Sequence, residues 1–192
     1  METRMLYENE VPQAAKTARG IFDHCMREQI KDAQVVRLTE QYLEPENLIV
    51  MMRKAELFLW GTFENGELIA VGGLQQEGHI TMLYVYPYFQ RLGIARFIVG
   101  KMKEYAKNRL NRDRITVNAM PVQAAAYFER LGFKRLKDNV DADAPYVTLW
   151  SYTTEETVYP VKSIPERTVI KIVCGFLAAI FFVAVVFILT YF

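Results

Sequence analysis

A short loop between an apolar strand and an amphipathic helix carries the residues best suited to hold a phosphate group. The segment Gln90–Ala95 contains Gly93, whose missing Cβ lets the backbone approach a ligand closely. A helix beginning near Ile94 would present unpaired N–H groups and the positive end of its dipole to that loop. Arg91 adds a cation beside it. The pattern therefore predicts a cradle for a pyrophosphate group.

The spacing of this loop excludes two common phosphate-binding motifs. A Walker loop would continue into Gly-Lys-Ser or Gly-Lys-Thr, and no such sequence follows Gly93. The dinucleotide fingerprint needs three glycines, and here Gly93 stands alone. The loop must therefore belong to another class of phosphate-binding protein.

Alternating strands and helices surround the loop and must position it. The run His79–Val85 predicts the strand before it, and apolar residues recur at helical spacing after it. Asn65-Gly66 between two apolar runs predicts a hairpin. The predicted helices cover 12–30, 45–55, 94–110 and 122–131, and the predicted strands cover 57–63, 67–74, 79–85, 114–120, 133–136 and 145–152. This order predicts an α/β (α+β) fold with a mixed sheet flanked by helices.

Three motifs in this order resemble the GCN5-related N-acetyltransferase (GNAT) family. They are Gln90-x-x-Gly93-x-Ala95 after a Leu-Tyr-Val strand, the strand Ile115–Asn118, and the helix with a Leu-Gly-Phe turn at Ala126–Phe133. The resemblance covers residues 1–153. It implies a mostly antiparallel central sheet and acetyl transfer from acetyl-CoA to a primary amine.

The resemblance also implies a set of residues that bind acetyl-CoA. In the family two adjacent strands splay apart, and the pantetheine arm lies between them against backbone groups. Asn118 matches a position that often bonds this arm or an ordered water, although it could equally be a strand-end turn residue. The implied binding residues are Leu83, Tyr84, Val85, Gln90, Arg91, Leu92, Gly93, Ile94, Ala95, Asn118 and Phe128.

His79 is the candidate general base, because family members place His or Glu at the matching strand position. Imidazole titrates near neutral pH, which suits proton removal from an amine. The alternative is a histidine at a strand start that faces solvent or bonds a nearby carboxylate. Glu77 is a second candidate base, and it could also be an ordinary residue of the Glu77-Gly78 turn.

The position of the general acid departs from the family pattern. Many members carry Tyr four residues before the Gly of Leu-Gly-Phe, and this chain has Phe128 there. Tyr127 is adjacent, but one residue along a helix rotates a side chain by about 100°. Tyr127 therefore donates the proton only after a local shift, or the thiolate leaves without a dedicated acid. A thiol with a pKa near 8.5 is a tolerable leaving group.

Cysteines, histidines and net charge exclude several other chemistries. The chain has two cysteines, Cys25 and Cys174, and neither lies in the site motifs. We therefore expect direct attack in a ternary complex and no covalent acyl-enzyme. The two cysteines and two histidines are too far apart in sequence to predict a metal site. A net charge of +1 gives no reason to expect nucleic acid as a partner.

The C-terminal segment predicts a membrane anchor. The run Ile172–Leu189 contains no charged residue. About 20 residues of helix cross a hydrocarbon core of about 30 Å. Arg167 and Lys171 precede the run, which favours a cytoplasmic catalytic domain. The predicted divisions are a GNAT domain at 1–153, a linker at 154–167 and a transmembrane helix at 168–192, with the lipid bilayer as a partner. The alternative is a buried core helix.

Two other functions remain open from the sequence. Phe128 allows a regulatory module that binds acyl-CoA without transferring the acyl group. The spacing Gly175-x-x-x-Ala179 suits close packing of two membrane helices, so a membrane scaffold or a homodimer is also compatible.

Overall fold

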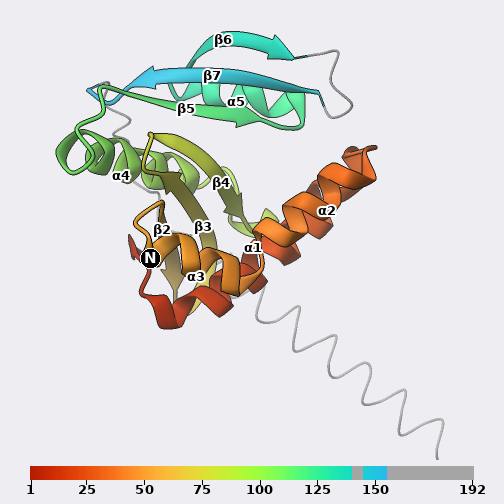
Figure 1. The fold of residues 1–192 in the computed structure, drawn as a ribbon, viewed down its shortest axis with the longest axis vertical. Helices are drawn as coiled ribbons and strands as arrows, with labels where there is room; N and C mark the ends of the chain where they lie inside the picture. Colours follow the sequence, from red (N-terminus) through yellow and green to blue (C-terminus); the bar gives the residue numbers. More distant parts are fainter. Residues whose placement is uncertain (140–144, 155–192) are drawn as a thin grey trace, which may run out of the picture. The chain divides into compact units, whose positions relative to one another are not determined.

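The computed structural model of the chain describes residues 1–139 and 145–154 (Figure 1). These residues form seven strands and five α-helices. The strands are β1 (Glu2–Met5), β2 (Leu57–Glu64), β3 (Glu67–Gln75), β4 (His79–Val85), β5 (Arg114–Ala119), β6 (Lys134–Asn139) and β7 (Tyr146–Tyr152). The helices are α1 (Val11–Cys25), α2 (Ala33–Tyr42), α3 (Pro45–Arg53), α4 (Ile94–Asn108) and α5 (Ala125–Arg130).

The described strands make one sheet in the order β1-β2-β3-β4-β5-β7-β6. Every neighbouring pair is antiparallel except β4 and β5, which are parallel. The predicted mixed, mostly antiparallel sheet is therefore confirmed. The single parallel pair exists because α4 carries the chain from the end of β4 back to the start of β5.

Helices cover the two faces of the sheet unequally. α4 and α5 pack on one face, against a core that includes Ile98, Val117 and Leu149. α1 and α3 pack on the other face, but only over β2, β3 and β4 (Figure 1). Within the described residues, this second core contains no residue from β5, β6 or β7.

The local signals of the sequence agree with the structure at most elements. Asn65 and Gly66 have φ of 50° and 84°, the left-handed geometry of a type I′ hairpin turn between β2 and β3. The predicted first helix ends at Cys25, and a 3-10 turn at Arg27–Gln29 follows it. The prediction of helix up to residue 30 was therefore too long.

Two elements of the fold were not predicted. β1 pairs with β2 at the sheet edge, and α2 follows the turn after α1. α2 contributes no fully buried residue, although Val35, Val36 and Tyr42 pack partly buried against the second core. Asp32 caps this helix by accepting from the N–H groups of Gln34 and Val35, and that capping residue was its clearest sequence signal.

The predicted membrane helix and its linker lie outside the described residues. The chain divides into two units, Met1–Val161 and Lys162–Phe192, and the second falls entirely outside them. Within 1–139 and 145–154, none of the helices has the length and hydropathy needed to cross a bilayer.

Candidate active site

β4 and β5 pair only where the beginning of β4 meets the middle of β5, and then separate. His79 pairs with Thr116 and Ile80 with Val117, and later residues of β4 have no partner on β5 in the described sheet. Figure 1 shows the two strands diverging. The second half of β4 therefore has one edge without a strand partner, as the family resemblance implied.

The free edge of β4 presents backbone groups of Leu83 and Val85. The Tyr86 N–H donates to the Ile69 carbonyl on β3 at 3.1 Å. Because backbone groups of successive strand residues point to alternate sides, those of Leu83 and Val85 point into the split. An extended ligand such as a pantetheine arm can pair there as an added strand would.

The loop after β4 enters α4 through Gly93. Gly93 has φ of 86°, a left-handed conformation that residues with a Cβ rarely adopt. The first helical hydrogen bond runs from the Phe97 N–H to the Gly93 carbonyl at 2.9 Å. The N–H groups of Ile94 and Ala95 consequently have no acceptor among the described residues. They form an anion site at the positive end of a 15-residue helix.

Gln90 fixes this cradle to the end of β4. Its Nε2 donates to the Val85 carbonyl at 3.0 Å. Leu92 packs against the core below the loop, while Arg91 is exposed at the rim. Two predicted binding elements, the free strand edge and the cradle, therefore form one continuous surface.

His79 lies at the closed end of the split. Its Nδ1 is 2.8 Å from Thr116 Oγ1, so the ring is held by the neighbouring strand. Burial lowers the pKa of His79 below its usual value, although the nearby Glu77 charge acts in the opposite direction. A neutral imidazole at neutral pH is the form that a general base requires.

Glu77 is less well placed than His79. It is exposed and precedes Gly78, whose φ of 87° marks a turn. It affects the site through its charge and forms no hydrogen bond to His79 in the described part of the chain. The geometry therefore favours His79 of the two candidate bases.

A contact between α2 and β4 that the sequence did not indicate joins a tyrosine to a threonine that lies close to His79 along β4. The register between β3 and β4 shifts at Thr81, which has no partner residue and forms a bulge. The Tyr42 hydroxyl, at the end of α2, donates to Thr81 Oγ1 at 2.8 Å. Burial raises the pKa of Tyr42, and the hydrogen bond to Thr81 partly offsets this effect. Burial also raises the pKa of the neighbouring Tyr84.

Phe128 is a packed core residue. It is buried, and its ring centroid is 5.4 Å from that of Phe133. Tyr127 packs beside it at 5.5 Å. Burial raises the pKa of Tyr127 to about 12, against the opposing charges of Arg96 and Arg130. Tyr127 therefore keeps its proton at neutral pH. It lies close enough to Arg96, in the first turn of α4, for the charge of that residue to act on its pKa.

Asn118 is bonded within the sheet. Its Oδ1 accepts a hydrogen bond of 2.9 Å from the Thr148 hydroxyl on β7. It is exposed, and it follows Val117, the last residue of β5 that pairs with β4. Its amide nitrogen donates no hydrogen bond within the described residues and can still reach a ligand.

The described residues contain no cluster of three or more His, Cys, Asp and Glu side chains that could hold a metal ion. Cys25 is a free, half-buried thiol at the end of α1, and burial raises its pKa. The second cysteine, Cys174, lies outside the described residues.

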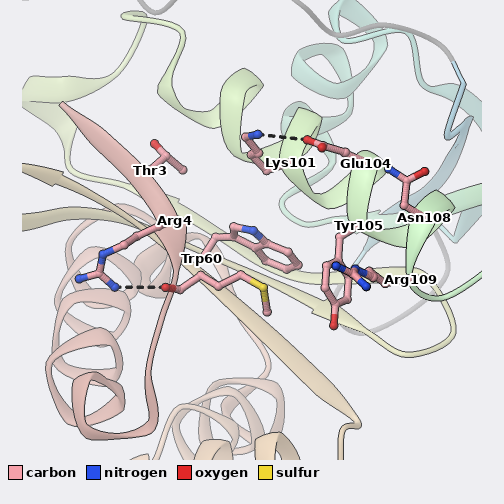
Figure 2. A pocket seen from close by; sticks show the side chains of 9 residues that line it. Thr3, Arg4, Trp60, Lys101, Glu104, Tyr105, Asn108 and Arg109 are labelled. Carbon is pink, nitrogen blue, oxygen red and sulfur yellow. Dashed lines mark hydrogen bonds and ion pairs between the residues drawn. The ribbon is translucent and has the colours of Figure 1, made fainter.

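A cavity of about 440 Å³ lies away from the cradle, beside the second half of α4. Trp60 and Tyr105 lie at its centre, with Lys101 and Glu104 paired above them (Figure 2). This cavity is on the face of the sheet that α4 covers, whereas His79 faces the opposite side. It takes no part in the chemistry described above, because neither the split nor the cradle opens into it.

Comparison with known proteins agrees with this geometry. The model of the acetyltransferase (GNAT) domain family matches residues 23–145. No curated protein sequence matches the chain.

Several solved structures share the fold. The PaiA N-acetyltransferase of Thermoplasma acidophilum, in complex with coenzyme A, is 16% identical with a TM-score of 0.65, over 79% of this chain and 98% of that one. An aminoglycoside 6′-N-acetyltransferase complexed with coenzyme A is 12% identical with a TM-score of 0.59, over 81% and 99%. The spermidine N-acetyltransferase of Vibrio cholerae is 13% identical with a TM-score of 0.55, over 80% and 96%. Together with the match to the domain family, the split strands and the glycine cradle identify the chain as a member of the GNAT family, an acyl-CoA N-acyltransferase.

Proposed function

We propose that this enzyme transfers an acetyl group from acetyl-CoA to a primary amine by direct attack in a ternary complex. One observation carries the proposal: the split between β4 and β5 has the Gly93 cradle at its open end and His79 at its closed end. A donor lying along the split would therefore place its pyrophosphate at the Gly93 cradle and its thioester near His79.

The donor would be bound mainly by backbone groups. The N–H groups of Ile94 and Ala95 would hold the pyrophosphate, with Arg91 at the rim. The backbone groups of Leu83 and the N–H of Val85 would pair with the pantetheine arm, while the Val85 carbonyl accepts from Gln90. A backbone N–H of this strand would also donate to the thioester oxygen, where negative charge develops during attack.

His79 would take the proton of the attacking amine. The amine nitrogen bonds to the thioester carbonyl carbon, the carbon–sulfur bond breaks, and the sulfur leaves with the bonding electron pair. The proton lost by nitrogen passes to the imidazole, directly or through a water. The Thr116 hydroxyl, 2.8 Å from Nδ1, holds the ring so that Nε2 can face the amine.

The thiolate would leave without a proton donor at the Phe128 position. Phe128 is buried and has no titratable group. Tyr127 is protonated but packed, with its pKa raised to about 12. A thiolate is stable enough to depart unprotonated near neutral pH.

We also propose that the catalytic domain is tethered to the cytoplasmic face of a membrane. The uncharged run Ile172–Leu189 and the preceding Arg167 and Lys171 support this. The spacing of Gly175 and Ala179 would let the spans of two copies pack together. The tether would favour acceptors at or near the membrane.

A thiol-release assay over a panel of primary amines tests the proposed reaction. The panel should include spermidine and an aminoglycoside, which fold relatives acetylate by name, together with amino acids and short peptides. Mass spectrometry of the amine should show one added acetyl group. Thiol release no faster than hydrolysis for every amine, with no acetylated product, would contradict the proposal.

A further inference from the structure

The half of the sheet beyond β4 has an open face. Along β7, Val147, Leu149 and Ser151 are buried, while the residues between them are partly exposed. The buried set faces α4 and α5. The alternate residues therefore face the other side, where no described helix packs against β5, β7 or β6.

Two aromatic rings and two cations form a platform on this open face, namely Trp150, Tyr152, Arg114 and Lys134. The rings of Trp150 and Tyr152 stand edge to face, with centroids 4.9 Å apart. The Arg114 guanidinium lies 4.8 and 5.2 Å from their centroids. The Lys134 ammonium lies 5.5 and 5.9 Å from them. Stacking of this kind fixes both cations against the sheet.

Arg114 is exposed and unpaired with any carboxylate in the described structure. A guanidinium held against aromatic rings in this way can still offer N–H groups to a ligand, and their fork matches a carboxylate. Two other acidic residues, Asp138 of β6 and Glu129 of α5, are paired elsewhere, because both bond Arg135. The open face of these three strands is therefore cationic and aromatic.

The platform is in register with the candidate base. His79 lies opposite Thr116, Thr116 opposite Trp150, and Trp150 opposite Lys134. Residues directly opposite in a sheet share a face, and neighbouring strands are about 4.8 Å apart. Trp150 therefore lies on the order of 10 Å from His79 on the same surface. Two acidic residues lie close to this row. Asp113 directly precedes Arg114, and Glu77 precedes Gly78, which lies against the Arg114 backbone. Neither forms an ion pair with Arg114 in the described structure.

We propose that the platform binds a carboxylate of the acceptor, so that the preferred acceptor is an amine carrying a carboxylate on the order of 10 Å away. An extended peptide spans that distance in about three residues. This inference rests on the proposed acetyl transfer and specifies its substrate class. Binding to an open, charged surface also fits a peptide better than a small apolar amine, which would find no enclosing pocket there.

The test uses the full chain in an uncharged detergent and two matched peptides, Ala-Ala-Asp-Asp and Ala-Ala-Asn-Asn, each with an amidated C-terminus. Binding is followed without acetyl-CoA by tryptophan fluorescence, because Trp60 is buried under α4 and Trp150 is on the platform. Thiol release then gives kcat/KM for each peptide. We expect the acidic peptide to bind and react roughly tenfold better, as loss of one charge-assisted hydrogen bond would predict.

Three variants separate the platform from general charge effects. Arg114→Gln should remove the preference for the acidic peptide, and Arg114→Lys should keep part of it. Arg109→Gln, at the end of α4 beside the other cavity, is the matched control and should keep all of it. If Arg114→Gln fails to fold, Lys134→Gln and the two peptides on the wild-type chain still decide the question.

The outcomes distinguish this inference from the proposed function. Equal binding and equal rates for the two peptides would overturn the platform while leaving acetyl transfer intact. Preferential binding of the acidic peptide without turnover of any amine would support the platform and contradict the proposed reaction.

Discussion

The Tyr42 hydroxyl donates a hydrogen bond of 2.8 Å to Thr81 Oγ1, and this contact joins the last residue of α2 to the bulge in β4. α2 contributes no buried residue of its own. It is held by this bond and by the packing of Val35, Val36 and Tyr42 against the core under α1. Glu40 of α2 also pairs with Arg19 and Arg27. Among the described residues, the Tyr42–Thr81 bond is the side-chain hydrogen bond that ties α2 directly to the catalytic strand.

Tyr42→Phe should weaken acceptor binding more than donor binding. The substitution removes the hydroxyl and leaves Thr81 without its donor, at a cost of about 1 kcal/mol of unfolding free energy. Loosening of α2 should raise the KM for the amine severalfold, while the Kd for acetyl-CoA stays unchanged. Steady-state kinetics and calorimetry measure the two constants. Tyr88→Phe is the control, because Tyr88 is 81% exposed. Equal effects of the two substitutions would contradict the role given to Tyr42.

Gly93→Asp should abolish tight binding of acetyl-CoA. Gly93 has φ of 86°, so any side chain there strains the backbone, and a carboxylate would repel the pyrophosphate. Loss of one or two charge-assisted hydrogen bonds should cost about 2–4 kcal/mol, or roughly 30–1000-fold in Kd. Calorimetry with coenzyme A measures the change. Gly20→Asp on α1, where nothing lies within 4 Å of an added Cβ, is the control. An unchanged Kd for Gly93→Asp would remove the cradle from the site.

His79 should set the acidic limb of the pH–rate profile. Burial lowers its pKa below the usual 6.5 or so, so the rate should rise with pH through that lowered pKa and be level at neutral pH. His79→Ala should lower kcat by about 10²–10⁴-fold and remove this limb. The profile of kcat/KM between pH 4.5 and 8 is the measurement. A loss below threefold with an unchanged profile would assign the proton to water or to Glu77.

The sequence predicted the elements whose signals are local. The hairpin at Asn65-Gly66, the strand His79–Val85 and the helix that begins after Gly93 each depend on residues close together in the chain. The structure confirms these elements. β1 was missed because four residues gain their stability from pairing with β2, far along the chain. α2 was missed although Val35, Val36 and Tyr42 lie partly buried on one side of it, and none of its residues is fully buried.

The sequence could not supply the contacts that depend on register. Tyr42 and Thr81 are 39 residues apart, and nothing in either segment indicates the other. The bond between Asn118 and Thr148 also follows from the pairing of β5 with β7, while the role of Asn118 toward the donor stays a prediction. The platform around Trp150 likewise requires the strand order β5-β7-β6, which a pattern of single strands does not contain.

The stability of the β1 edge should fall in acid. Arg4 donates to both carboxylate oxygens of Glu10 at 2.8 and 2.6 Å, and this pairing lowers the pKa of Glu10 to about 2. The stabilisation is full above the unfolded pKa of about 4.3 and disappears as the pH falls toward 2. Glu10→Gln should lower Tm by about 2–4 °C at pH 6 and by less at pH 2.5. Glu67→Gln, whose carboxylate has no ion pair in the described structure, is the control. A pH-independent difference between Glu10→Gln and wild type would contradict the assignment.

Truncation after Val161 should release an active, soluble enzyme from the membrane. The buried apolar residues of β7, Val147 and Leu149, belong to the core that α4 and α5 cover, so we expect this domain to fold without the C-terminal run. The run Ile172–Leu189 is long enough to span a bilayer, so the full chain should stay in the membrane fraction after an alkaline carbonate wash. The truncated chain should be monodisperse and bind coenzyme A with the same Kd. A tether would raise the effective concentration of membrane-bound acceptors toward the millimolar range. The full chain should therefore acetylate an amine on a vesicle faster than the truncated chain does. Both chains should acetylate a soluble amine at the same rate. Release of the full chain by carbonate, or aggregation of the truncated one with loss of coenzyme A binding, would place the C-terminal run in the core of the protein.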